Sequence, residues 1–346
     1  MSLAAPAVAR PFLRSLSFVY GLAVRLRNRR FDRPAAARRA PIPVLSVGNL
    51  GVGGTGKTPL VAWLARRLRD AGRRPAVVSR GYGGRAGRGP LVVSSGDGPR
   101  CSAAECGDEP SMLARALDGV LVVVGSDRLR AVEAAAEGGA DVALLDDGFQ
   151  HRRLARDLDV VLLDATAPFG NGRLLPAGPL REPVAGLGRA DVIVLTRAGP
   201  GVPLEGACAA VRRNNATAPI VAADHRLVGF ADRAGRSAAA PGRAVAFCAI
   251  GNPGRFRADL ERAGIEIVAF RAWRDHHRYT AAELGELGRS AERGHAVLVT
   301  TEKDLARIDG AGPQGSELLV ARIEAVVQDE RLLLDAVDLA LAAPRT

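Results

Sequence analysis

One glycine-rich segment of the chain has residue types and a spacing that are specific for phosphate chemistry. It reads Gly51-Val52-Gly53-Gly54-Thr55-Gly56-Lys57-Thr58, which matches G-x-x-x-x-G-K-[ST] in full. Glycines allow backbone N–H groups to turn inward around phosphates, and the dipole of a following helix favours negative charge there. The Lys57 ammonium would contact the β- and γ-phosphates, and the Thr58 hydroxyl would bind Mg²⁺. The segment predicts a nucleoside-triphosphate site that uses Mg²⁺.

The neighbouring elements support this interpretation. An apolar run at Val44–Val47 is typical of a strand and lies just before the segment. Pro59 follows it and opens a helix-length stretch, and proline is favoured at the first helical position. A chance match in a chain with 40 glycines would have no reason to lie between a strand and a helix.

Lysine is rare in this chain. Of its 48 basic residues only Lys57 and Lys303 are lysines, so arginine serves wherever any cation is sufficient. A lysine kept in such a background is expected where a compact ammonium is needed. Lys303 lies in Thr301-Glu302-Lys303-Asp304, which is similar to the N-K-x-D motif of GTPases but has the wrong spacing. The mismatch argues against guanine specificity, and the role of Lys303 stays open.

Two adjacent carboxylates end an apolar run. Asp146 and Asp147 follow Val142–Leu145, and Gly148 comes next in place of a helical pattern. A carboxylate at the carboxyl end of a parallel strand is where a protein with such a phosphate loop holds Mg²⁺, directly or through water. The pair is therefore a predicted metal site, with either aspartate as the ligand.

Two further segments carry titratable side chains. Asp108, in Gly107-Asp108-Glu109-Pro110, could cap a helix or accept a proton from an attacking hydroxyl. In Asp275-His276-His277-Arg278-Tyr279, adjacent histidines point apart in most conformations, which argues against a shared metal ion. One histidine could partner a carboxylate or contact the nucleotide, and an exposed loop fits the spacing equally well.

Short apolar runs alternate with helix-length stretches from residue 41 onward, which predicts an α/β fold with a mostly parallel sheet and flanking helices. The expected strands are Val44–Val47, Ala76–Ser79, Leu91–Val93, Val120–Val124, Val142–Leu145, Val160–Leu163, Val192–Leu195, Ile220–Ala223, Ala244–Ile250, Ile265–Phe270 and Ala296–Thr300. Glycine and proline at residues 197–206 predict a hinge. We expect a nucleotide-binding domain at 41–197, a smaller α/β domain at 206–328 and a C-terminal helix at 329–346 that could pack on either.

Most of the net charge of +11 lies in residues 1–40, which hold nine arginines and one acid. The remaining residues carry +3, which argues against a nucleic-acid-binding protein with a basic surface throughout. An apolar stripe precedes the arginine cluster and comprises Phe12, Leu13, Leu16, Val19, Tyr20, Ala23 and Val24. The segment fits a helix lying on an anionic membrane surface, and it fits equally well a helix packed on its own domain.

The first forty residues are unlike a membrane span or a secretory signal. The longest uncharged run there, Ser15–Val24, has ten residues, whereas a span needs about 20 apolar residues. Its flanks also lack the features of a secretory signal. The four cysteines, Cys101, Cys106, Cys208 and Cys248, are too scattered for a disulfide framework or a zinc site, which favours reduced thiols.

Read in order, these motifs resemble those of the lipid A 4′-kinase (tetraacyldisaccharide 4′-kinase) family. The resemblance runs from residue 46 to residue 304. It rests on Ser46-Val47-Gly48-Asn49-Leu50, Gly51–Pro59, Ser79-Arg80-Gly81-Tyr82-Gly83, Gly107–Pro110, Asp127-Arg128, Asp146–His151, Gly172–Pro183, Gly251-Asn252-Pro253, Asp275-His276-His277 and Thr301–Asp304.

The resemblance implies an ATP-dependent, Mg²⁺-using kinase of lipopolysaccharide biosynthesis. It would transfer the γ-phosphoryl group to the 4′-hydroxyl of a tetraacylated disaccharide 1-phosphate. The resemblance also implies two α/β domains joined by a hinge, with the nucleotide between them. The enzyme would lie on the cytoplasmic face of the inner membrane as a peripheral or monotopic protein without a transmembrane span. Its partners would be the acylated phospholipid substrate and the anionic membrane surface, with no nucleic acid and no protein partner.

The resemblance also implies roles for individual residues. Asp108 would act as the base on the sugar hydroxyl, supported by a histidine of the Asp-His-His run, His276 in preference to His277. Glu182 would help Asp146 or Asp147 to hold Mg²⁺. The residues expected to contact the phosphoryl donor or the lipid acceptor are Arg80, Tyr82, Arg128 and Arg181.

Two other classes of protein compete with the kinase. A GTPase or ATPase switch of the metallocentre-assembly or partitioning type could share the glycine-rich loop. Such a switch should carry N-K-x-D or a second lysine early in the loop, where this chain has Val52 and Gly53. A nucleotide-dependent membrane scaffold would carry the same motifs and form no phosphorylated product.

Overall fold

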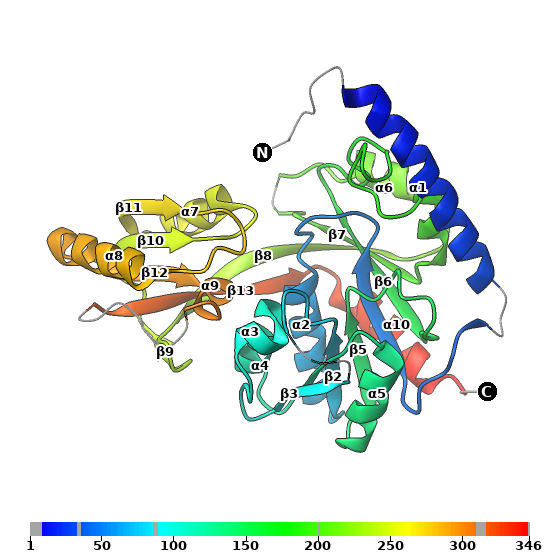
Figure 1. The fold of residues 1–346 in the computed structure, drawn as a ribbon, viewed down its shortest axis with the longest axis horizontal. Coiled ribbons are helices and arrows are strands. Elements are labelled where there is room, and N and C mark those ends of the chain that lie inside the picture. The colour runs from blue at the N-terminus through cyan, green and yellow to red at the C-terminus, as the bar shows by residue number, and fades with distance from the viewer. Residues whose placement is uncertain are drawn as a thin grey trace.

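The computed structural model describes residues 9–32, 36–85, 87, 89–199, 201–308 and 316–344. They fold into two bodies of strands and helices, joined by two long strands (Figure 1). We call the larger body the first lobe; it runs from α1 (Ala9–Phe31) to α6 (Glu205–Arg212) and includes α10 (Glu330–Ala342). The smaller body runs from β9 (Ser237–Ala238) through α9 (Glu302–Leu305) to residue 308, and we call it the second lobe.

The first lobe is built on a mostly parallel sheet, as the sequence predicts. Its strands are β1 (Val44–Asn49), β2 (Pro75–Ser79), β3 (Leu91–Ser95), β4 (Leu121–Val124), β5 (Val142–Asp146), β6 (Leu158–Asp164) and β7 (Val192–Thr196). They lie in the order β7-β6-β1-β5-β2-β4-β3, and only β3 runs antiparallel to its neighbour. The carboxyl ends of β1 and β5 are therefore adjacent, which brings the glycine-rich loop beside the paired aspartates.

Helices cover both faces of this sheet. The helices of the first lobe besides α1, α6 and α10 are α2 (Lys57–Asp70), α3 (Ala103–Cys106), α4 (Asp108–Ala116), α5 (Arg128–Glu137) and the 3₁₀ helix η2 (Val184–Arg189). Alternate side chains of β1 point to opposite faces: Leu45 and Val47 join a buried cluster with α2, α4 and α10, whereas Val44 joins a cluster with α5. Burial on both faces explains why these strands are continuous apolar runs.

The second lobe is a smaller α/β unit. Its strands β10 (Arg243–Cys248), β11 (Glu266–Ala272) and β12 (Val297–Thr301) are parallel, and its larger helices are α7 (Pro253–Arg262) and α8 (Ala281–Gly294). The α9 turn follows β12 directly. The carboxyl end of β12 therefore places the Thr301–Asp304 motif at an edge of the second lobe.

Two long strands form a ribbon between the lobes, β8 (Ile220–Ala231) and β13 (Leu318–Val327). The start of β8 pairs parallel with β7, and the rest of it pairs antiparallel with β13. The end of the ribbon nearer the second lobe is paired to β12 through β13. One hydrogen-bonded path thus runs through both lobes, and the two lobes share a single framework.

The chain passes between the lobes later than the Gly/Pro-rich residues 197–206 suggest. Helix α6 follows those residues but stays with the first lobe, because its Ala207 and Val211 are buried against Ile193 and Leu195 of β7. The passage lies in β8, after the three residues that pair with β7. Helix α10 also packs on the first lobe, where its Leu333 and Val337 are buried.

Helix α1 lies along one side of the first lobe (Figure 1). One face of it is fixed by contacts with residues 174–182: the Ser17 hydroxyl donates to the Leu174 carbonyl at 2.9 Å, and the Tyr20 hydroxyl donates to the Arg181 carbonyl at 2.8 Å. Val24 is buried on the same face. The inner face of the helix is therefore a normal packed surface.

The opposite face of α1 exposes large apolar side chains to solvent. They are Phe12, Leu16, Phe18, Val19, Leu22 and Leu26. The stripe expected from the sequence is thus divided, because Tyr20 and Val24 point inward while Phe18, Leu22 and Leu26 join the outer face. Within the described residues, no helix combines the length and apolar character needed to cross a bilayer.

Candidate active site

The glycine-rich loop leaves β1 at Asn49 and enters α2 at Lys57. Gly56 caps the helix with φ +80°, and a Cβ there would overlap the imidazole of His225 from the ribbon, so only glycine fits. The loop is braced from outside: the Pro179 carbonyl accepts from Val52 N–H at 2.7 Å, and Asn49 Nδ2 donates to Thr55 Oγ1 at 3.0 Å. Among the described residues no side-chain hydrogen bond caps the start of α2 at Gly56, so the first N–H groups of the helix can face a phosphate.

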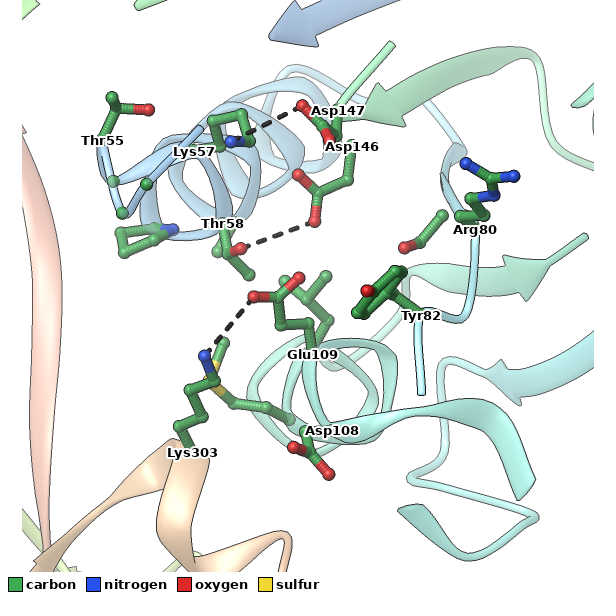
Figure 2. A pocket seen from close by; sticks show the side chains of 18 of the residues that line it. Thr55, Lys57, Thr58, Arg80, Tyr82, Asp108, Glu109, Asp146, Asp147 and Lys303 are labelled. Carbon is green, nitrogen blue, oxygen red and sulfur yellow. Dashed lines mark hydrogen bonds and ion pairs between the residues drawn. The ribbon is translucent and has the colours of Figure 1, made fainter. Parts of the chain in front are cut away.

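A cavity of about 1160 Å³ opens beside this loop and is lined by both lobes. Lys57, Thr58 and Asp146 line it from the first lobe, and His276 and Lys303 line it from the second. Figure 2 shows the side chains of Thr58, Asp146, Glu109 and Lys303 directed toward the same space. The structure therefore brings together motifs that lie far apart in the sequence.

Asp146 and Asp147 have different surroundings. Thr58 Oγ1 donates to Asp146 Oδ2 at 3.5 Å, and the Asp146 carboxylate is buried. Asp147 instead lies 3.5 Å from Lys57 Nζ and accepts a 2.6 Å hydrogen bond from Arg181. Burial opposes ionisation of Asp147, but Lys57 and Arg181 outweigh it and hold its pKa below the ordinary value. Asp147 is thus already paired with cations.

The pair of Thr58 and Asp146 fits a hard divalent cation. Both offer oxygen ligands, and burial together with the nearby Glu109 carboxylate raises the pKa of Asp146, which indicates a site short of positive charge. Among the described residues, no group of three or more His, Cys, Asp or Glu side chains could cage a metal ion. Mg²⁺ commonly uses one or two protein carboxylates and takes its other ligands from phosphates and water.

Glu182 is not brought to this place. Its fully buried carboxylate lies 2.8 Å from Arg189 Nη2, and its other oxygen accepts from Gln150 Nε2 at 2.8 Å. These donors already compensate its charge, and Glu182 does not line the cavity with Thr58 and Asp146. The geometry therefore does not support Glu182 as a metal ligand. The Glu182 carboxylate instead fixes the segment after Arg181 beneath α1.

Asp108 is held between two side chains of the second lobe. Arg307 Nε donates to Asp108 Oδ2 at 2.7 Å, and His276 Nδ1 lies 3.1 Å from the same oxygen. His276 and Asp108 are 168 positions apart in the sequence. Burial raises the pKa of Asp108, but Arg307 and His276 outweigh it and bring the pKa below the ordinary value. The carboxylate is thus kept ionised and able to accept a proton.

The adjacent residues His276 and His277 contact different parts of the structure. His277 stacks on Trp273 with ring centroids 5.5 Å apart, and its Nε2 lies 3.1 Å from Glu283, so it anchors the loop. His276 has φ +66°, a conformation that is costly for a residue other than glycine. This strained turn directs His276 to Asp108.

The four expected substrate residues all line the cavity. Arg181 binds Asp147, whereas Arg80 and Tyr82 are exposed. Arg128 is buried, donates to the Gly125 carbonyl at 2.5 Å and leaves its Nε without a hydrogen-bond partner among the described residues. Burial and the neighbouring Arg80 lower the pKa of Arg128 to about 10. Clustered guanidinium groups with spare donors fit an anionic ligand.

Sequence reasoning missed Arg307 and His225. Arg307 lies three residues after Asp304, a spacing that pairs side chains on a helical turn, and this signal could have been noticed. His225 has no such signal, because its contact with Gly56 arises only when the ribbon crosses the phosphate loop.

Together, a phosphate loop, a carboxylate beside its Thr58 and an ionised carboxylate across the cavity define a phosphotransferase of the P-loop class. The family model LpxK, described as tetraacyldisaccharide-1-P 4′-kinase, matches residues 9–341. The chain belongs to this family.

Individual relatives agree with the family match. The chain is 46% identical to a tetraacyldisaccharide 4′-kinase of Anaeromyxobacter sp. (strain Fw109-5) over 316 residues, which cover 89% of this chain and 85% of that protein. It is 42% identical to the protein of the same name from Geobacter metallireducens, with 94% and 96% covered. The crystal structure of LpxK from Aquifex aeolicus in complex with ATP superposes with a TM-score of 0.80 at 30% identity, covering 96% of this chain and 99% of that one.

Proposed function

We propose that the chain transfers the γ-phosphoryl group of ATP to the 4′-hydroxyl of a tetraacylated disaccharide 1-phosphate. Family membership supplies the substrate class. The observation that carries the chemistry is the position of Asp108, which lines the same cavity as Lys57 and Thr58 and is held ionised by the second lobe. A carboxylate placed opposite the phosphate loop suits a base for an attacking hydroxyl.

In the proposed reaction, the 4′-oxygen attacks the γ-phosphorus while its proton passes to Asp108. The bond between the γ-phosphorus and the bridging oxygen breaks, and ADP leaves. The N–H groups of the phosphate loop and Lys57 hold the triphosphate, and His276 orients Asp108. Thr58 and Asp146 would hold Mg²⁺, which neutralises charge on the triphosphate when bound.

The acceptor is proposed to enter along α1. Tyr20, Arg27 and Phe31 of this helix line the cavity, while its outer face exposes Phe18 and Leu22. The sugar and its phosphate could therefore reach Arg80, Arg128 and Arg181 while the acyl chains stay in the membrane. Tyr82, which also lines the cavity, is proposed to contact the acceptor as well.

The outer face of α1 has the pattern of a membrane-docking surface. At about 100° per residue, Arg14 and Arg25 fall on one flank of the exposed apolar stripe and Arg27 falls on the other. Apolar side chains would enter the lipid, and the guanidinium groups would meet anionic headgroups. We place the enzyme as a peripheral protein on the cytoplasmic face of the inner membrane.

The two lobes are proposed to close over the nucleotide. Asp108, from the first lobe, contacts Arg307 and His276 from the second, and the β8–β13 ribbon is the covalent connection near this cavity. Closure would exclude water from the transferred phosphoryl group. The residues 41–197 would bind the nucleotide, and the second lobe would complete the site.

An assay with ATP, Mg²⁺ and the tetraacyldisaccharide 1-phosphate in detergent micelles tests this function. We expect a bisphosphorylated lipid and ADP in equal amounts. Asp108→Asn should lower kcat by about 10² to 10⁴, because the base is lost, while ATP affinity changes little. Asp335→Asn, at an exposed position of α10, is the matched control. GTP hydrolysis without a phosphorylated lipid would instead favour a switch protein.

A further inference from the structure

The second of the chain's two lysines lies in the same cavity as the first. Lys57 lines it from the first lobe and Lys303 from the second. The other 46 basic residues are arginines, so a lysine at each of these two positions is a feature of the site rather than of the composition. An ammonium is a compact point charge, whereas a guanidinium is flat and longer.

Lys303 has no tight partner among the described residues. Its Nζ lies 3.7 Å from Glu109 Oε1 and 3.6 Å from Asp275 Oδ1, both beyond hydrogen-bond distance. The side chain is 21% exposed and extends into the cavity toward Glu109 (Figure 2). An ammonium held this loosely between two carboxylates remains free to donate to a ligand.

The backbone that carries Lys303 is rigid. Thr301 Oγ1 caps the α9 turn and donates to Asp304 Oδ2 at 2.6 Å, and the Ala249 N–H donates to Asp304 Oδ1 at 3.1 Å. Arg307, which is almost fully buried, donates to the Ala249 carbonyl at 2.7 Å and also holds Asp108. The turn bearing Lys303 is therefore linked, through the Asp304–Arg307 pair, to the carboxylate proposed as the base.

The proposed reaction fixes where the transferred group must lie. The γ-phosphoryl group has to be held from the side of Lys57 and Thr58, and the hydroxyl that attacks it must be within reach of Asp108. Figure 2 shows Lys303 and Asp108 on one side of this space and Lys57 and Thr58 on the other. Lys303 is thus placed to face the transferred group from the side opposite Lys57.

We propose that Lys303 is a catalytic residue whose ammonium binds the equatorial oxygens of the γ-phosphoryl group as it moves from ADP to the acceptor. This inference rests on the proposed kinase function. Lys303 exchanges no proton or electron; it stabilises negative charge while the hydroxyl proton goes to Asp108 and ADP leaves. A fixed cation in a site that excludes water stabilises such charge more than a mobile one in solvent.

A purely structural role for Lys303 predicts different behaviour. If the ammonium only neutralised Glu109 and Asp275, arginine would replace it, since a guanidinium pairs with carboxylates at least as well. Removing the Glu109 charge would then also rescue the loss of Lys303. The discriminating variants are Lys303→Arg, Lys303→Met and the double variant Lys303→Met with Glu109→Gln.

Full-length variants should be compared by steady-state kinetics, by ATP titration and by binding of ADP, Mg²⁺ and tetrafluoroaluminate, a mimic of the transferred group. We expect both single Lys303 variants to lower kcat by about 10² or more and to weaken binding of the mimic similarly. ATP affinity should change by less than about threefold, because the contact forms mainly in the transition state. Arg243→Ala, which removes an exposed ion pair of the second lobe, is the control.

The outcomes separate the two proposals. A wild-type protein that forms no phosphorylated lipid overturns the kinase function itself. An active wild type whose Lys303→Arg variant keeps its kcat, or whose double variant recovers it, shows that Lys303 only balances charge. Loss of kcat in Lys303→Arg with an unchanged melting temperature, and no recovery in the double variant, supports the catalytic role.

Discussion

Arg307 sets the electrostatic state of Asp108. Its guanidinium is 1% exposed and donates to Asp108, to the Ala249 carbonyl and, at 3.3 Å, to Asp304 Oδ1. Its Nη2 also lies 3.2 Å from His276 Nδ1. That nitrogen therefore faces both a permanent donor, Arg307, and the Asp108 carboxylate.

We predict that Arg307 is a positioning residue that acts through Asp108. Asp108 has a pKa below the ordinary value because Arg307 and His276 outweigh burial, so it stays ionised as pH falls. In Arg307→Met the burial remains and the main opposing cation is gone, so the pKa of Asp108 should rise. The acidic limb of the kcat/KM profile should move to higher pH, whereas Arg307→Lys should return it toward the wild-type position.

A loss of folding would not produce that profile. Removing Arg307 leaves the buried Asp304 carboxylate without its cation, so the melting temperature should fall as well. The pH profile of the folded fraction separates the two effects. An acidic limb that stays in place in Arg307→Met would contradict the positioning role.

At the residue scale, the sequence predicts which residues belong to the site better than it predicts which of them contact one another. Asp108 and His276 stand out by motif, but their contact depends on a strained turn and on the meeting of two lobes, which local spacing does not encode. Glu182 is the opposite case. Its carboxylate lies in a motif yet is buried against Arg189, because the chain there folds beneath α1.

At the scale of elements, periodicity predicts a helix at α1 but not which face is buried. A helix with apolar residues around most of its circumference has two candidate inner faces, and packing against residues 174–182 selects Tyr20 and Val24. The parallel sheet was predictable because buried strands are continuous apolar runs. The ribbon was not, because the paired residues of β8 and β13 lie 89 or more positions apart in the sequence.

The second prediction tests the outer face of α1. Phe18→Ser combined with Leu22→Ser should weaken binding to vesicles of anionic lipid by about tenfold or more per residue, because each side chain loses its transfer into lipid. Activity on an acceptor dispersed in detergent should change little, since neither side chain lines the cavity. Vesicle co-sedimentation measures the binding.

Leu339→Ser on α10 is the matched control for that experiment, because Leu339 and Phe18 are both 74% exposed. A general effect of surface apolar groups would weaken vesicle binding equally in both proteins. Unchanged binding in the α1 variant would place the membrane contact on another surface.

At the scale of the whole molecule, the ribbon joins the two lobes, and contacts such as that of Arg307 with Asp108 link them at the cavity. The ribbon crosses the phosphate loop, where His225 meets Gly56, and Arg255 of α7 donates at 2.7 Å to Asp224 beside it. The second lobe is thereby fastened to the strand that touches the nucleotide loop. Occupation of the loop and the position of the second lobe are expected to be linked through this strand.

The third prediction follows from that linkage. With Mg²⁺, a non-hydrolysable ATP analogue and the acceptor in detergent, the second lobe should close further, because triphosphate oxygens would bind cations from both lobes. Solution scattering with the detergent contrast-matched should show a smaller radius of gyration for the wild type. Lys57→Ala, which loses the phosphate contact but keeps the ribbon, should show no change under the same conditions. A wild-type radius that is unchanged at saturating ligand would mean that the lobes are already fixed at their working distance. The strained His276 turn and the Arg307 contact would then be permanent features of a preformed site.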